Sequence, residues 1–257
     1  MNGNRQSSES SQEGRWKYLA NFLRGVVILM LGYLSILFLT DSFSVKRVDG
    51  RYPQAINNAK NLALAQKNYA SQSKGSFAPP TYHLADGTPA HGWATRMLPL
   101  MDHADLYDQI DFTVPWNHPR NEELMKQEIR SFLIPELSQT TDASGHALIH
   151  FTLNSHLFPD NESLTEDEIS RADGLGNTIL MGEIQQGLPA WGAPGNARDP
   201  ALGLRPGTNT FGVTDHDGMT VIGFADGRVR YVDNKIDPRI LKALATPDGG
   251  EEIPEEW

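Results

Sequence analysis

The chain of 257 residues contains no cysteine, so it has no disulfide framework, no thiolate nucleophile and no cysteine-based zinc site. This absence does not by itself identify a compartment. Basic residues are also few, because 22 Lys and Arg face 32 Asp and Glu for a formal net charge of −10. The first forty residues carry four basic and two acidic side chains, so the remainder stands at −12. Such a charge argues against nucleic acid or an anionic membrane surface as a partner.

Several motifs of common enzyme classes are missing as well. No Gly-x-Ser-x-Gly nucleophile elbow occurs. The loop Asp173-Gly174-Leu175-Gly176-Asn177 has two glycines but lacks the third glycine and the preceding strand of a dinucleotide-binding fingerprint. His146 and His150 lack the glutamate of a zincin and lie on strand-like sequence. We therefore expect a protein that is not an enzyme and that holds no cofactor.

One uncharged and largely apolar stretch covers the sixteen residues from Gly25 to Thr40. Together with Tyr18 to Arg24 it reaches the roughly 20 residues that a membrane-spanning helix needs. A helix in a soluble core would alternate an apolar stripe with a polar face, and this stretch is apolar all round. We expect a transmembrane helix at residues 18–40, with the lipid bilayer as its partner. The alternative is a cleaved export signal that ends near Ser42-Phe43-Ser44.

Three basic residues stand before this stretch and three after it, so the positive-inside rule favours neither orientation of the helix. A short polar tail is readily left in the cytoplasm while a large domain is exported behind the helix. This reasoning divides the chain into a cytoplasmic tail at 1–17, the helix at 18–40, a juxtamembrane linker at 41–52, an ectodomain at 53–246 and an acidic tail at 247–257.

The ectodomain sequence favours an α+β fold. Apolar residues between Pro53 and Ser73 recur at spacings of three and four, which predicts an amphipathic helix. Asp226-Gly227 between two apolar stretches is a strong hairpin signal, and a two-residue turn there would place Phe224 opposite Val229. Further strands are expected at 131–135, 147–153 and 178–182, and further helices at 93–107 with a break at Pro99, from 119, from 165 and at 237–245. The expected architecture is an amphipathic helix packed on a mainly antiparallel sheet.

His216, followed after nine residues by Asp226-Gly227, resembles the prepilin-processing-associated H-x9-D-G motif of a bacterial family called domain of unknown function 1559. Other segments similar to that family stand in the same order: Asn57 to Tyr69, Gly75 to Pro80, Trp93 with Leu98-Pro99, Tyr107-Asp108 to Trp116, Asp173 to Glu183 with Asn177 and Thr178 inside it, and Trp191.

The resemblance covers the chain from about Arg51 onward. It implies a pilin-like exported domain on an N-terminal membrane helix, in the bacterial inner membrane with the domain on its outer, periplasmic face, and with no established activity. One departure is the absence of a Gly-Phe-Thr-Leu-Ile-Glu type leader. Prepilin-peptidase cleavage and assembly into a pseudopilus therefore stay open.

The candidate site residues centre on His216. With Asp215 and Asp217 beside it, the imidazole could ligate a cation or shuttle a proton. The favoured interpretation is structural, with His216 and Asp226 hydrogen-bonding the loop into the hairpin near Gly227. The trio of Asp215, His216 and Asp217 is only a weak metal candidate, and we expect no metal.

Two further sets of residues have two interpretations each. Glu183 follows an apolar strand and is either a buried hydrogen-bond anchor or a carboxylate of a site. Trp93, Trp116 and Trp191 could stack on a sugar or peptide, although packing in a core is the favoured interpretation.

The sequence thus predicts a single-pass, membrane-anchored envelope protein that acts through self-assembly or binding of another envelope protein. The alternative is a solute- or glycan-binding module on the cell envelope. A third hypothesis, a metal-assisted hydrolase built on His216, Asp217 and Asp226, lacks a second group to supply a base and an oxyanion donor.

Overall fold

The computed structural model describes residues 26, 30, 52–214, 216–251 and 253–254. The expected membrane helix at 18–40 lies outside this part except for Val26 and Met30, which are helical. The expected tail at 1–17 and the expected linker at 41–52 also lie outside it, except for Tyr52, which is the first residue of a helix. Among the residues that are described, no helix combines the length and the apolar character needed to cross a membrane.

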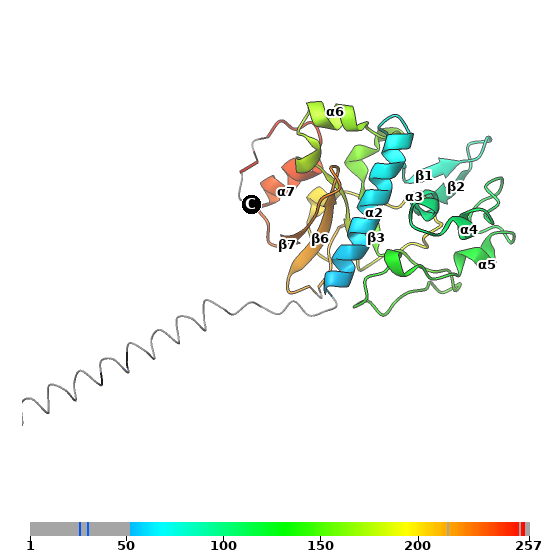
Figure 1. The fold of residues 1–257 in the computed structure, drawn as a ribbon, viewed down its shortest axis with the longest axis horizontal. Helices are drawn as coiled ribbons and strands as arrows, with labels where there is room; N and C mark the ends of the chain where they lie inside the picture. The colour runs from blue at the N-terminus through cyan, green and yellow to red at the C-terminus, as the bar shows by residue number, and fades with distance from the viewer. Residues whose placement is uncertain (1–25, 27–29, 31–51, 215, 252, 255–257) are drawn as a thin grey trace, which may run out of the picture. The chain divides into compact units, whose positions relative to one another are not determined.

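The longest described helix is α2, which spans Tyr52–Gln72 and confirms the amphipathic helix expected there (Figure 1). Its buried side carries small residues, among them Ala55, Ala59 and Ala63. A Cβ built on Gly223 of strand β6 would lie 3.6 Å from the Cβ of Ala63, so the helix backbone approaches the sheet closely. Small side chains on both surfaces permit this approach.

Five strands form a mixed sheet in the order β5-β3-β4-β6-β7. β3 pairs with β5 in parallel, and the other three pairs are antiparallel. The strands are β3 (Phe151–Asn154), β4 (Ile179–Glu183), β5 (Ala197–Arg198), β6 (Met219–Phe224) and β7 (Val229–Asp233). The described chain is therefore an α+β structure with a helix packed on a mixed sheet.

The sheet is covered on both faces. Val221 belongs to the core under α2, whereas Ile222 and Phe224 belong to a second apolar cluster. That cluster is completed by Leu244 of α7 (Pro238–Ala245) and by Phe211. The alternation along β6 follows the two-residue period of a strand, so a central strand with apolar residues on both sides is buried between two layers.

The turn between β6 and β7 differs from the predicted two-residue turn. The N–H of Phe224 donates to the carbonyl of Arg228, which leaves a three-residue loop closed by Gly227 at φ +88°. A left-handed residue at this place is typical of three-residue hairpin loops. Val229 therefore opposes Gly223, and Tyr231 opposes Val221. The predicted pairing of Phe224 with Val229 is wrong by one residue.

Short elements form the rest of the domain. The expected break at Pro99 is confirmed, because α3 ends at Met97, a 3₁₀ turn contains Pro99, and α4 starts at Ala104. The expected strand at 131–135 is wrong, since a 3₁₀ turn stands there. The remaining elements are β1 (Thr81–His83), β2 (Pro89–Gly92), α3 (Trp93–Met97), η1 (Leu98–Leu100), α4 (Ala104–Tyr107), α5 (Glu122–Met125), η2 (Arg130–Phe132), η3 (Ser155–Leu157), η4 (Pro159–Asn161), α6 (Glu166–Arg171), η5 (Leu175–Asn177) and η6 (Pro200–Leu202).

Candidate functional site

Three ionisable side chains meet at the end of β4. His216 Nδ1 lies 3.2 Å from Oε2 of Glu183, and His216 Nε2 lies 3.6 Å from Oε2 of Glu136. The side chains of His216, Glu183 and Glu136 are only 1, 0 and 7% exposed. Each nitrogen of one buried imidazole thus faces a different carboxylate. We call this group the Glu–His–Glu cluster.

Glu183 is held by the backbone of the neighbouring strand. Its Oε2 accepts a hydrogen bond of 2.8 Å from the N–H of Val221. The preceding residue, Gly182, has no room for a side chain, because a Cβ there would lie 2.6 Å from atoms of both Ile222 and Phe211. A glycine at this position therefore leaves room for the side chains of Ile222 and Phe211 in the apolar layer beside β4.

His216 is carried by the loop 211–218, which leads from Phe211 of the second apolar cluster to β6 and in which Asp215 lies outside the described residues. This loop runs along the end of β4, where the N–H of Gly212 donates to the carbonyl of Glu183 over 2.8 Å. It then turns through Asp217 and Gly218, at φ +51° and +79°, and the N–H of Met219 donates to the carbonyl of His216. Two successive left-handed residues reverse the chain, so His216 points inward just before β6 begins.

The electrostatics of the cluster favour a bound proton. Burial raises the pKa of Glu183 above its ordinary value, and the His216 imidazole opposes this only in part. Burial alone would lower the pKa of His216, but Glu183 and Glu136 together raise it above its ordinary value. A protonated imidazole between the two carboxyls is the state that this arrangement supports.

The same geometry does not suit a metal ion. Metal ligands converge on one point at about 2.0–2.3 Å from each donor, whereas the two carboxylates here approach opposite nitrogens of the ring. The described residues contain no group of three or more potential ligands that could hold a metal. Of the weak metal candidates from the sequence, Asp215 lies outside the described residues and Asp217 is exposed in the turn.

The direct contact expected between His216 and Asp226 is wrong. The two residues stand beyond opposite ends of β6, which spans Met219–Phe224 and places them roughly 20 Å apart at the usual rise of a strand. Asp226 instead restrains its own turn, where its Oδ1 accepts a hydrogen bond from the N–H of Arg228 and its Oδ2 pairs with the guanidinium. The two ends of the motif therefore fix different ends of one strand.

Asn177 and Thr178 precede β4 and lie beside the hairpin turn that carries Asp226. The carbonyl of Thr178 accepts a hydrogen bond from the N–H of Ala225, and Thr178 Oγ1 donates to the carbonyl of Gly174. Asn177 Nδ2 donates to the carbonyl of Asp173. These bonds close the loop before β4 against the hairpin turn, which gives both residues a structural role.

The tryptophans fit the packing interpretation. Trp93 and Trp191 are 0 and 1% exposed, and Trp191 Nε1 donates to the carbonyl of Gln127. Trp116 is half-buried, with its ring centroid 4.9 Å from that of His146. Core packing is confirmed for Trp93 and Trp191, and neither can stack on a ligand at the surface.

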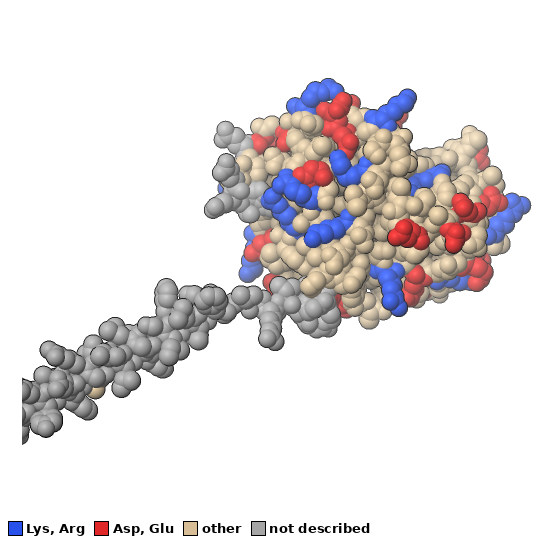
Figure 2. All heavy atoms as spheres, viewed as in Figure 1, with Lys and Arg blue, Asp and Glu red and all other residues tan. Residues whose placement is uncertain are grey.

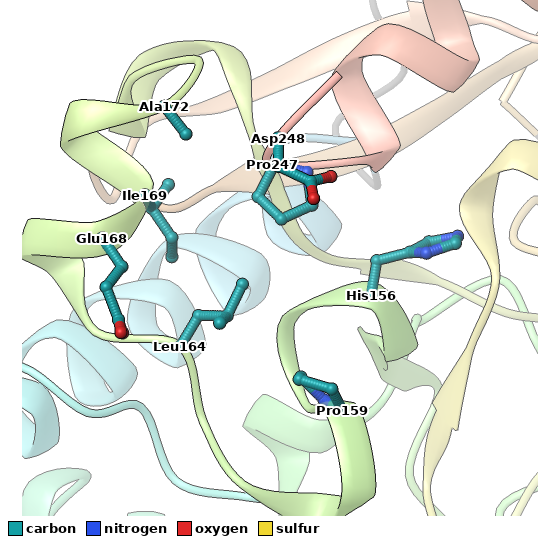
Figure 3. A pocket seen from close by; sticks show the side chains of 8 residues that line it. All are labelled: His156, Pro159, Leu164, Glu168, Ile169, Ala172, Pro247 and Asp248. Carbon is teal, nitrogen blue, oxygen red and sulfur yellow. The ribbon is translucent and has the colours of Figure 1, made fainter. Parts of the chain in front are cut away.

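A cavity of about 400 Å³ opens between α6 and the segment after α7 (Figure 3). Its wall is mainly apolar, with Leu164 and Ile169 turned toward the opening. The His156 ring points away from these residues, and its Nε2 lies 2.8 Å from Asp199 Oδ1. Glu168 is engaged in a capping box with Thr165. The wall therefore offers shape and apolar surface but few polar groups that are free to select a ligand.

Sequence reasoning missed Glu136. It lies in the segment Ile134-Pro135-Glu136-Leu137, where a single acidic residue stands among apolar ones. That isolation is the signal that could have drawn attention to it, because a lone carboxylate in apolar sequence is often buried with a partner. Its partner, His216, lies eighty positions further along the chain, so no local pattern links the two residues.

Fold and site together define the class of protein: an α+β domain in which a long helix covers a mixed sheet and a Glu–His–Glu cluster is buried at one end of it. Residues 47–168 match the model of a family described as a protein of unknown function (DUF1559), and this match supports the family assignment expected from the sequence. Glu136 lies inside the matched residues, whereas Glu183 and His216 lie beyond them. No curated protein and no solved structure gives a significant match to the chain.

Proposed function

We propose that the chain is a membrane-anchored, exported envelope protein whose pilin-like domain acts through self-assembly or binding of another envelope protein, and not by catalysis. This proposal rests on the short distance along the chain between the uncharged stretch and α2. The uncharged stretch that ends at Thr40 is followed shortly by α2, which starts at Tyr52 and packs along the sheet. A membrane helix followed by a helix on an antiparallel sheet is the layout of a pilin-type subunit.

The outer surface of α2 supports a protein contact. Its exposed residues are uncharged except for Lys60, and Leu64 is 57% exposed. Figure 2 shows uncharged atoms over much of this helix, with acidic and basic side chains gathered mainly to either side. Cores of protein interfaces are depleted in charged residues, so this surface suits another protein better than it suits an ion or a polyanion.

The absence of cysteine makes the topology directly testable. Single cysteines at Ser8 and Asp167 would place one thiol in the tail and one on the exposed surface of α6. In intact spheroplasts a membrane-impermeant maleimide should label Asp167→Cys and leave Ser8→Cys unlabelled until lysis, with both variants in the membrane fraction. Recovery of the chain in the soluble cytoplasm, or labelling of the tail alone, would refute the proposal.

The contact surface can be tested in the same way. A photo-crosslinker attached to Leu64→Cys on α2 should give a discrete crosslinked species in membranes, either a dimer or an adduct of defined mass. The matched control is Asp105→Cys, an exposed position on α4. Equal crosslinking from both positions would remove α2 as the contact surface.

Solute binding is the second candidate, and the cavity beside α6 is the observation that favours it, because its volume of about 400 Å³ lies in the range of small-ligand sites. Thermal shift with panels of sugars, amino acids and short peptides tests this candidate. A stabilising ligand should lose its effect in Ala172→Phe, which fills the cavity, and keep it in Ala143→Phe, an exposed control. No shift with any panel member would exclude those ligand classes.

A further inference from the structure

Buried at the end of β4, the imidazole of His216 faces a carboxylate through each of its two nitrogens. A neutral imidazole has one N–H donor and one acceptor, whereas an imidazolium has two donors. Only the protonated ring can therefore present a donor to both Glu183 and Glu136. When the ring loses its proton to solvent, a bare nitrogen lone pair faces one of the carboxylates inside the protein.

We propose that Glu136, Glu183 and His216 form a proton-dependent latch, which fastens the loop 211–218 to the end of β4 while the imidazole is protonated and releases it when the proton leaves. The proposal concerns a conformational device of the domain and does not depend on membrane attachment or on a partner. It assigns to the histidine of the H-x9-D-G motif a role as a switch.

Few other charges act on the ring. Among the described residues, the ionisable side chains in contact with it are Glu183 from β4, Glu136 from the segment after η2, and Tyr231 from β7, whose ring meets the imidazole edge-on. α2 contributes only two charged residues, of which Lys60 is exposed and Lys67 pairs with Glu166.

The strands bring little further charge to the ring. β6 has no charged residue. β7 adds Arg230, whose guanidinium lies over Phe224 in the second apolar cluster, and Asp233, which is exposed and accepts a hydrogen bond from the N–H of Lys235. On the loop of His216, Asp217 is exposed, and Asp215 lies outside the described residues. Among the described residues, the charges that act most on the imidazole are those of its two carboxylates.

The loop has two kinds of attachment. Its first residues are anchored in the core, because Phe211 and Val213 are fully buried and the N–H of Gly212 donates to the carbonyl of Glu183. Beyond Val213 the loop is held by His216, by the exposed Thr214, whose N–H and Oγ1 both bond Gln185 Oε1, and by the bond from the N–H of Asn234 to the carbonyl of Gly218. Loss of the imidazolium weakens the buried attachment in this second part, which favours local opening beyond Val213.

Hydrogen–deuterium exchange of the full chain in mild detergent tests the latch, with labelling times adjusted for the intrinsic exchange rate at each pH. Amides of the loop 211–218 should lose protection as pH rises from 6 to 9, by up to about tenfold per pH unit above the pKa of the imidazole for one linked proton. Amides of β3 should not change in parallel. Protection of the loop that does not vary with pH would overturn the proposal without any variant.

Glu136→Gln separates a latch from a merely structural contact. A glutamine amide can donate to the deprotonated Nε2, so both protonation states of the ring are satisfied and the pH dependence of loop protection should largely disappear. Glu128→Gln is the matched control, because Glu128 is exposed and bonds Thr140 near the same segment. Unchanged pH dependence in a folded Glu136→Gln variant would overturn the assignment of Glu136 to the latch.

Discussion

Replacement of Glu183 by alanine should lower the free energy of unfolding by about 2–4 kcal/mol, whereas glutamine should cost less than about 1 kcal/mol. Alanine leaves the buried N–H of Val221 without its acceptor, which costs about 1–3 kcal/mol. It also empties space among side chains that are fully buried, which adds a cavity cost of about 1–2 kcal/mol. Removal of a buried negative charge beside Glu136 offsets part of this loss.

Glutamine separates the hydrogen bond from the charge. Its amide oxygen can still accept from Val221, the desolvation cost of a carboxylate disappears, and Glu136 remains as the charged partner of the His216 imidazolium. Urea unfolding at pH 7 measures both variants in the full chain in detergent, followed by tryptophan fluorescence, to which the buried Trp93 and Trp191 contribute. Glu128→Ala is an exposed control and should stay within about 0.5 kcal/mol of wild type. Equal losses for alanine and glutamine would refute the hydrogen-bond account and make the charge itself the stabilising feature.

Four further outcomes follow from the structure. Gly182→Ala should cost about 1–3 kcal/mol in urea unfolding, because its Cβ would clash with the layer behind β4. Arg198→Met should cost about 3–5 kcal/mol, measured likewise, since it strands four backbone carbonyls that the buried guanidinium now satisfies. Losses in His216→Ala and Asp226→Ala should add in the double variant within about 0.5 kcal/mol, because the residues are far apart; marked non-additivity would contradict the structure. His150→Asn should flatten the fall in melting temperature of the wild type as pH drops from 7 to 5.

Local sequence signals were sufficient for the elements that depend on neighbouring residues. The spacing of apolar residues located α2 to within one residue at each end, and the Thr165 capping box marked the start of α6. The hairpin was predicted, but its register was not, because Asp226-Gly227 fits both a two-residue turn and the three-residue loop that the structure has. A shift of one residue in the register changes the face of β6 to which each side chain of β7 is matched.

The segment at 131–135 shows why the rest could not be predicted. Asn58 of α2 donates from Nδ2 to the carbonyls of Arg130 and Leu133, and the N–H of Ile134 donates to His150 Nδ1. Side chains from distant parts of the chain thus satisfy backbone groups that a strand would have paired. The Glu–His–Glu cluster was hidden for the same reason, since Glu136 reaches His216 only through the tertiary fold.

His150 and His216 place opposite proton demands on the domain. His150 accepts from Ile134 N–H at Nδ1 and bonds the carbonyl of Gln139 at Nε2, so it must stay neutral, and burial lowers its pKa. Its contribution to stability is present above its unfolded pKa of about 6.5 and is lost as pH falls. His216 has a raised pKa, so its contribution is present below about 6.5 and is lost as pH rises through the folded value. The two histidines therefore limit stability from opposite sides. Only the alkaline limit acts through the loop 211–218, which makes release of that loop separable from acid unfolding of the domain.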